Sequence, residues 1–199
     1  LVPEVNDIEY YSIQLLETTS DHKSFIARTG YTGEDGFEIF GSHEFIGKLW
    51  DKLMDAGVQP CGLGARDVLR LEVCFSLYGN ELNDDVTPLE VGLKWTVKMD
   101  KKDFVGKSAL ETKTPRYRLA KLSLEKGIPR AGYTVEDEDG TEVGIVTSGS
   151  MSVALGKGIA LARLDKNLYQ DSKKLNIKIR DKVYPAELNK KPFVSGGTK

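Results

Sequence analysis

The sequence predicts an α+β protein, with a mixed strand and helix portion at residues 1–113 and a small antiparallel β-barrel at residues 114–199. The first portion alternates strand-like runs with amphipathic helical patterns, which favours a sheet packed against helices. The second portion holds six short strand-like runs within about 80 residues, separated by turn signals, as is typical of a small barrel or sandwich. The boundary is placed near Thr114, where the pattern changes.

Three strand-like segments open the chain. They cover residues 8–17 (IEYYSIQLLE), 23–29 (KSFIART) and 36–40 (GFEIF), and a turn rich in Gly, Thr and Asp precedes the third. Because side chains alternate along a strand, Glu38 should lie on the face that Phe37 and Ile39 do not use. Such a glutamate is either solvated or directed into a pocket, and the usual exposure of Glu favours solvation.

Two helices are expected next. Apolar residues recur at helical spacing between Ser42, a suitable N-cap, and Gly57, a suitable stop, and this helix should pack on a sheet. Residues 62–75 give a second helical pattern that breaks at YGNEL. This pattern puts Arg66 and Arg70 four positions apart on one face of the helix.

The remaining elements follow in order. Residues 93–99 predict a strand in which Trp95 belongs to the core, and residues 103–113 predict a short helix with Asp103 as its N-cap. The six strand-like runs of the barrel are YRLAKLSLE, GYTVE, EVGIVTSG, KGIALARL, KLNIKIR and KVYPAEL.

The composition excludes several classes of protein. The chain has 199 residues, 40% hydrophobic and 29% charged, which argues against disorder. No run approaches the roughly 18 apolar residues of a membrane span, and the opening LVPEVNDIEYY resembles no targeting signal. We therefore expect no membrane partner. The opening, which lacks methionine, suggests the middle of a larger protein.

Cysteine and histidine are scarce. Cys61 and Cys74 form no CxxC motif, which favours a reducing compartment and places both residues in or near the core. His22 and His43 are the only histidines, too few for a zinc site or a His-based triad, so we expect no bound metal. We place His43 in the first turn of a helix.

The net charge of −2 conceals an uneven distribution. Residues 1–97 carry 7 Lys and Arg against 17 Asp and Glu, whereas residues 98–199 carry 21 against 13. The basic part could attract an acidic partner or an anionic ligand tail, or the two surfaces could simply differ. No run of five basic residues occurs, so we expect no nucleic-acid partner.

Six windows resemble one protein family in both order and spacing. They are RTGYTGEDGFEIF, GLGARDVLRLEVCFSLYGNEL, TPLEVGLKWTVKMDKKDFVGKSAL, IPRAGYTV, VGIVTSGSMSVAL and IALARL. Together they resemble the aminomethyltransferase, or T protein, of the glycine cleavage system. The resemblance extends through essentially the whole chain.

The resemblance implies a folate site. In that family the glutamate of the GEDGFE segment binds the pterin ring of tetrahydrofolate, which implies Glu38 here. The arginine of the GLGARD segment lies in the same site, which implies Arg66. Arg70, one turn later, is the alternative, unless it forms a structural ion pair. Tyr31 could cover a ring or cap a ligand bond, or could be a packed turn residue.

The resemblance also implies a reaction and its partners. The complete enzyme would pass a one-carbon unit from an aminomethylated lipoyl carrier, the H protein, to tetrahydrofolate, giving methylenetetrahydrofolate and ammonia. Tetrahydrofolate would be a substrate, and no metal would be required. The setting would be bacterial cytoplasm or, in a eukaryote, the mitochondrial matrix.

The sequence departs from the family pattern at its start. Full-length members carry about 150 further residues, the length of a typical domain, before the region that matches Leu1. The aspartate with a catalytic role lies in that region, so we expect the 199-residue chain to be an inactive C-terminal fragment with no catalytic residue of its own. Alternative functions are another folate-dependent demethylase or a non-enzymatic folate-binding protein. Members of the latter class usually carry a cysteine-containing KGCYxGQE-like segment, which RTGYTGEDGFE lacks.

Overall fold

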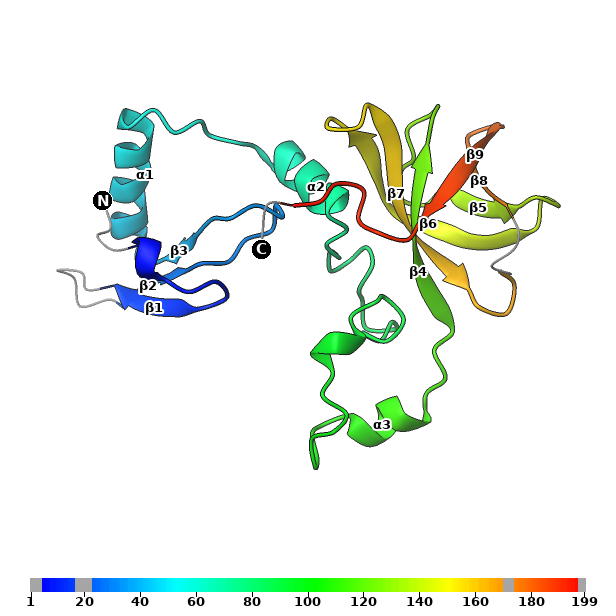
Figure 1. Ribbon diagram of the computed structural model, residues 1–199, viewed down its shortest axis with the longest axis horizontal. Helices are drawn as coiled ribbons and strands as arrows, with labels where there is room; N and C mark the ends of the chain where they lie inside the picture. Colours follow the sequence, from blue (N-terminus) through cyan, green and yellow to red (C-terminus); the bar gives the residue numbers. More distant parts are fainter. Residues whose placement is uncertain (1–4, 17–22, 170–173, 197–199) are drawn as a thin grey trace. The chain divides into compact units, whose positions relative to one another are not determined.

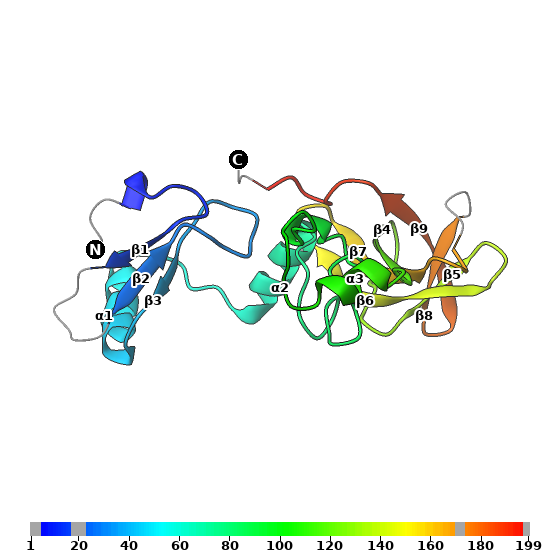
Figure 2. The same cartoon turned by 90° about the horizontal axis from the view of Figure 1, so that it is seen from below.

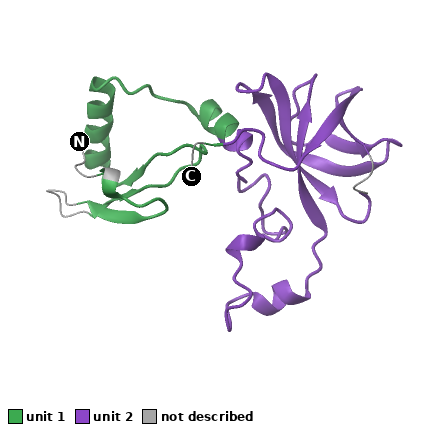
Figure 3. Cartoon of the chain, in the orientation of Figure 1, with its two compact units in different colours: residues 1–69, 196–199 green, residues 70–195 purple. Residues whose placement is uncertain are grey.

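The chain divides into two compact units (Figure 3). The computed structural model describes residues 5–16, 23–169 and 174–196, so His22 lies outside the described residues. Unit 1 comprises residues 1–69 and 196–199, and unit 2 comprises residues 70–195. The boundary expected near Thr114 falls within unit 2 and stays a prediction.

Unit 1 is built on a three-stranded antiparallel sheet. A 3-10 helix, η1 (Val5–Asp7), precedes strands β1 (Ile13–Leu16), β2 (Ser24–Ala27) and β3 (Glu38–Phe40), which lie in the order β1-β2-β3. Helix α1 (His43–Asp55) follows and lies against the sheet in both views (Figure 1, Figure 2). The three predicted strands, of which the first is confined to Ile13–Leu16, and the first predicted helix are confirmed. Glu17, the last residue of the first predicted strand, lies outside the described residues.

Helix α1 begins and ends where the sequence predicts. The Ser42 hydroxyl accepts a hydrogen bond from the Phe45 N–H at 3.2 Å, as an N-cap does. His43 is the first helical residue. Gly57 takes a left-handed φ of +79°, which only glycine adopts without strain, and so ends the helix.

The register of the sheet decides which side chains face α1. Ile26 pairs with Ile39, and Ala27 pairs with Glu38. A Cβ atom on Gly41 would lie 2.6 Å from the Phe45 ring and 2.8 Å from the Ser24 hydroxyl, so Ser24 points toward α1. Ile26 and Ile39 share that face by alternation. Glu38 therefore lies on the opposite face, as the sequence predicts.

Helix α2 (Leu63–Glu72) spans the boundary between the units. The helix is confirmed, although it ends before the predicted break at YGNEL. Cys74 takes a left-handed φ of +63°, and its N–H bonds to the Leu71 carbonyl at 2.9 Å, which closes the last turn.

Residues 73–112 differ from the predictions in three ways. The strand expected at residues 93–99 is wrong, because local turn bonds form the 3-10 helix η2 (Lys94–Thr96) instead. Trp95 is 67% exposed and is therefore not a core residue. Helix α3 (Lys107–Thr112) starts after Gly106, whose φ of +90° interrupts the helix expected from Asp103.

Six strands of unit 2 close into an antiparallel barrel, as predicted (Figure 1). Around the barrel the strand order is β4-β7-β6-β5-β8-β9. The bounds are β4 (Tyr117–Leu124), β5 (Thr134–Asp137), β6 (Glu142–Ser152), β7 (Lys157–Asp165), β8 (Leu175–Ile179) and β9 (Lys182–Asn189). Inward-facing apolar residues of these strands form the main core of unit 2, and its largest members include Leu122, Leu124, Leu164 and Ile177.

A second, smaller cluster attaches the end of α2 to the outside of the barrel. Leu71 packs with Ile159 and Leu161 of β7, and the half-buried Cys74 and Phe193 join them. The expectation of a near-core position is thus confirmed for Cys74. It is wrong for Cys61, which lies in the exposed connection before α2.

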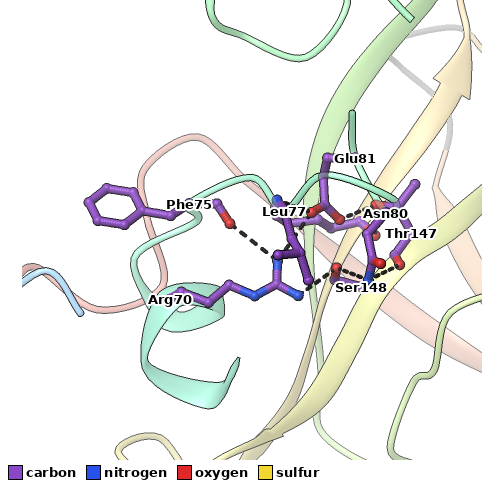
Figure 4. A network of polar contacts seen from close by, with 8 residues as sticks. Arg70, Phe75, Leu77, Asn80, Glu81, Thr147 and Ser148 are labelled. Carbon is purple, nitrogen blue, oxygen red and sulfur yellow. Dashed lines mark hydrogen bonds and ion pairs between the residues drawn. The ribbon is translucent and has the colours of Figure 1, made fainter. Parts of the chain in front are cut away.

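A buried polar network holds the same helix end (Figure 4). Arg70 and Glu81, 1% and 0% exposed, form an ion pair at 3.1 Å. The Arg70 guanidinium also donates to the Ser148 hydroxyl at 2.8 Å and to the Phe75 carbonyl at 3.2 Å. The second Glu81 oxygen lies 2.5 Å from the Thr147 hydroxyl. The network therefore joins α2, the loop after it and β6.

Strand β6 reaches this network through a β-bulge. The pairing of β6 with β7 shifts register between Val146 and Ser148, so Thr147 is the extra residue. A bulge re-aims a side chain, and here it delivers the Thr147 hydroxyl to Glu81. The Asn80 amide fixes the same turn by donating to the Thr147 carbonyl at 3.1 Å and to the Ser148 hydroxyl at 3.0 Å.

Glu90 joins the irregular segment to the start of the barrel. One carboxylate oxygen accepts hydrogen bonds from the Thr87 N–H and hydroxyl, both at 2.8 Å, and the other accepts from the Arg116 N–H at 2.8 Å. Burial alone would raise the pKa of Glu90, but these bonds to the charged form outweigh it and hold the pKa below its ordinary value.

The buried ion pair gives a prediction about stability. Arg70→Met leaves the Glu81 carboxylate buried without its cation, and we expect a loss of about 3–5 kcal/mol in the free energy of unfolding. The double variant Arg70→Met/Glu81→Leu removes both charges and should lose much less. Urea unfolding measures both, and equal losses in the single and double variants would contradict this account.

Glu90 gives a prediction about pH. Because its pKa is lowered in the folded state, its contribution to stability is present above the ordinary glutamate pKa of about 4.3 and is lost as the pH falls through the folded value. Glu90→Gln should therefore destabilise unit 2 at neutral pH and flatten the decline in melting temperature below about pH 5. The exposed Glu125→Gln serves as control, and an unchanged acid decline in Glu90→Gln would refute the assignment.

Candidate functional site

The RTGYTGEDG segment forms the connection between β2 and β3 in unit 1. Arg28 and Asp35 lie at its two ends and form a two-pronged ion pair, with Nε to Oδ1 at 2.9 Å and Nη2 to Oδ2 at 2.7 Å. The third arginine donor, Nη1, bonds to the Ile8 carbonyl at 2.9 Å. The planar fork of arginine suits this arrangement, which closes the loop at its base.

The ion pair between Arg28 and Asp35, called the clamp below, favours the charged form of both side chains. Hydrogen bonds from Arg28 hold the pKa of Asp35 below its usual value, and the bond to Asp35 raises the pKa of Arg28. Within the loop, the buried Gly33 takes a φ of +79°, a conformation that other residues rarely adopt. A Cβ atom on Gly196 would lie 2.1 Å from the Gly33 carbonyl, so only glycine fits beside the loop there.

Glu38 is the first residue of β3, directly after the clamped loop. Its side chain is half-buried, and one carboxylate oxygen accepts a hydrogen bond from the Thr29 hydroxyl at 2.5 Å. Of the two alternatives that the sequence left open, full solvation is therefore excluded. The carboxylate is held against the sheet on the face that α1 does not cover.

That uncovered face is largely apolar. Pairing aligns Ile13 with Ala27 and Glu38, and it aligns Leu15 with Phe25 and Phe40. Ile13, Leu15 and Phe40 are 61%, 57% and 52% exposed, whereas Ala27, between Ile13 and Glu38, is buried. An oriented carboxylate on an accessible apolar surface can bind a flat ring whose edge carries N–H donors.

Tyr31 and Arg66, two of the predicted site residues, lie together. The Arg66 guanidinium carbon sits 4.7 Å from the centre of the Tyr31 ring, a cation–π contact within unit 1. Arg66 is exposed on the first turn of α2, whereas Tyr31 is half-buried in the loop. Within the described residues, the Glu38 carboxylate bonds to Thr29 and not to Arg66.

Arg70 has different partners from Arg66. Its guanidinium is buried in the network of unit 2, where it pairs with Glu81 (Figure 4). This arrangement supports the structural ion pair that the sequence left open for Arg70.

The sequence reasoning missed Thr29 and Arg28. A signal for Thr29 existed, since it follows Ala27 by two positions and so falls on the face of Ala27 and Glu38. The clamp between Arg28 and Asp35 left only a weak signal, an opposite-charge pair at the two ends of a glycine-rich turn. Which of several such charges would pair depended on the turn geometry.

In residues 5–16, 23–169 and 174–196, no group of His, Cys, Asp and Glu is arranged to hold a metal, and no helix is long and apolar enough to cross a membrane. Two cavities, of about 440 and 250 Å³, open on the barrel of unit 2. Neither is lined by Tyr31, Glu38 or Arg66.

Two family models match the chain. The model for the GCVT N-terminal domain matches residues 3–101, and the model for the glycine cleavage T-protein C-terminal barrel domain matches residues 118–195. The second match covers the closed barrel.

Relatives of known name agree with these matches. An "Aminomethyltransferase" of Thermosipho melanesiensis is 47% identical over 184 residues, which is 90% of this chain and 50% of that protein. One of a Nostoc species is 48% identical over 187 residues, 92% of this chain and 50% of that protein. The chain thus spans about half the length of the curated relatives it matches.

A solved structure has the same fold. The crystal structure of glycine cleavage system aminomethyltransferase T from Bartonella henselae superposes with a TM-score of 0.82 at 32% sequence identity. The match covers 96% of this chain and 54% of that one.

Proposed function

The chain belongs to the glycine cleavage T-protein family, and from this premise we propose that unit 1 forms one wall of a tetrahydrofolate site in an aminomethyltransferase. The complete protein would transfer the one-carbon unit of an aminomethylated lipoyl carrier to tetrahydrofolate. The products would be methylenetetrahydrofolate and ammonia.

The orientation of Glu38 supports this proposal most strongly. The pterin edge offers an amino group and an adjacent ring N–H, and a carboxylate accepts two such bonds side by side. Glu38 presents a carboxylate on the accessible apolar face of the sheet, where a flat ring could lie against Ile13 and Phe40. The apolar surface thus suits the flat pterin ring, and the carboxylate suits the two N–H donors at its edge.

Arg66 and Tyr31 would act beside Glu38. The exposed guanidinium carries a fixed positive charge, and its stacking on the Tyr31 ring limits the directions it can take. Such a cation suits the anionic part of a folate, and the tyrosine body suits its apolar part. We assign all three residues to folate binding.

The protein's contribution to the reaction would be positional and electrostatic. The folate nitrogen must lie near the carbon carried by the lipoyl arm, and positive charge that develops there must be stabilised. We assign the chemical step to residues outside this chain, since Glu38 is used at the far edge of the pterin. No metal is needed for this transfer.

The charge distribution suggests how a carrier could be attracted. Residues 98–199 hold 21 basic against 13 acidic residues, which would favour an acidic H protein or the glutamate tail of folate. The named relatives come from bacteria, and we propose a cytoplasmic setting.

Replacement of Glu38 tests the folate assignment. Glu38→Gln keeps the size of the side chain but loses the charge-assisted bonds, and we expect tetrahydrofolate binding to weaken by about 1–3 kcal/mol. Glu34→Gln, in the same loop, is the matched control and should bind normally. Calorimetry or a spectroscopic titration measures the affinity, and an unchanged value for Glu38→Gln would remove the assignment.

An activity assay tests whether the chemical step depends on residues outside this chain. Incubated with aminomethylated lipoyl carrier and tetrahydrofolate, the 199-residue chain should release ammonia far more slowly than a full-length relative, because lost positioning can cost about 100-fold or more in rate. Turnover within about tenfold of the relative would place the chemistry in these residues. Turnover with another methylated amine donor, but not with the carrier, would favour a demethylase.

A further inference from the structure

We propose that Thr29 is a positioning residue that sets the direction of the Glu38 carboxylate. The inference rests on the proposed function, because it concerns how Glu38 would meet a ligand with two adjacent N–H donors. Thr29 would not touch the ligand. It would act only through Glu38.

The pair lies at the end of the ladder between β2 and β3. Ala27 lies opposite Glu38 in the last pair, and Thr29 follows two residues after Ala27, in the loop. The contact therefore joins a loop hydroxyl to the first side chain of β3. The Thr29 hydroxyl lies 2.5 Å from Oε2 of Glu38, the short distance expected of an O–H donor on a carboxylate.

Glu38 needs such a partner because little else orients it. The terminal torsion of a glutamate is broad, so the plane of its carboxylate is poorly defined unless a hydrogen bond defines it. In the part of the chain that the structure describes, Thr29 is the one donor to the Glu38 side chain. Its cross-strand neighbours, Ile13 and Ala27, offer no side-chain donor.

Thr29 is itself well fixed. A β-branched side chain has few χ1 states. The preceding residue, Arg28, is held by Asp35 and by the Ile8 carbonyl, so the backbone enters Thr29 from a restrained position. The clamp at the base of the loop therefore supports the hydroxyl that orients Glu38.

The bond to Thr29 leaves Glu38 able to bind a ligand. A carboxylate has about four acceptor positions, and the hydroxyl occupies one of them on Oε2. Both oxygens can still accept, so a pair of parallel N–H donors could bind in the plane that Thr29 selects. A ligand with only one donor needs no such plane. Thr29 should therefore affect how well the site discriminates a ligand with two adjacent N–H donors from a ligand with one.

The test uses Thr29→Val, which keeps the β-branched shape but removes the hydroxyl, with Thr29→Ser to restore it. Tetrahydrofolate and an analogue without the 2-amino group are titrated into each protein. We expect Thr29→Val to lose about tenfold in affinity for tetrahydrofolate, to lose less for the analogue, and to be rescued by Thr29→Ser. Thr32→Val, in the same loop, is the control and should bind as the parent does.

A double-mutant cycle separates this inference from the proposed function. In the Glu38→Gln background, Thr29→Val should have little further effect, because Thr29 acts through the carboxylate. If Glu38→Gln weakens binding and Thr29→Val does not, the inference fails while the proposed function stands. If Glu38→Gln has no effect, the proposed function fails, and the role of Thr29 in it fails too.

A measurement without ligand completes the test. Carbon-13 relaxation of the Glu38 side chain reports how well its torsions are defined. Thr29→Val should raise the mobility of the Glu38 carboxyl carbon while the amide spectrum of β2 and β3 stays the same. Thr29→Ala serves the same purpose if valine perturbs the fold. Equal order in parent and variants would overturn the inference.

Discussion

The register between β2 and β3 is the constraint on which the candidate site depends. A slip by one residue would turn Glu38 toward α1 and move Ile39 to the opposite face. The buried Ile26 pairs with Ile39 on the helix side, which opposes such a slip. The Arg28 and Asp35 clamp lies just beyond the last pair of the ladder and fixes the loop that sets the register. Apolar burial and one ion pair therefore act in the same direction.

In unit 2, too, an ion pair fixes the position of a structural element. The Arg70 and Glu81 pair is buried, and a pair of that kind adds little net stability over apolar residues of similar size. The pair instead fixes the orientation of the Arg70 side chain, because the guanidinium must bond to Glu81, Ser148 and the Phe75 carbonyl at once. The end of α2 is thereby fixed against β6, while Leu71 supplies the apolar contact with β7.

Periodicity in the sequence was enough to predict the six barrel strands, α1 with its Ser42 cap, and the face on which Glu38 lies. Residues 93–99 look like a strand, but isolated strands need a partner, and local turn bonds formed η2 there. Trp95 and Cys61 show that residue type alone does not establish burial. The burial of Arg70 depends on long-range contacts with Glu81 and Ser148, which helical spacing does not contain.

The central claim is that a folate ring lies on the face of the sheet that carries Glu38. Nuclear magnetic resonance can test this directly, with tetrahydrofolate titrated into the chain labelled at its methyl and glutamate carboxyl groups. The account predicts that the Glu38 carboxyl, the Ile13 methyls and the Ala27 methyl shift together, with transfer of magnetisation from pterin protons to Ile13. Shifts confined to barrel residues, or to Ile26 and Ile39 on the α1 side of the sheet, would contradict it.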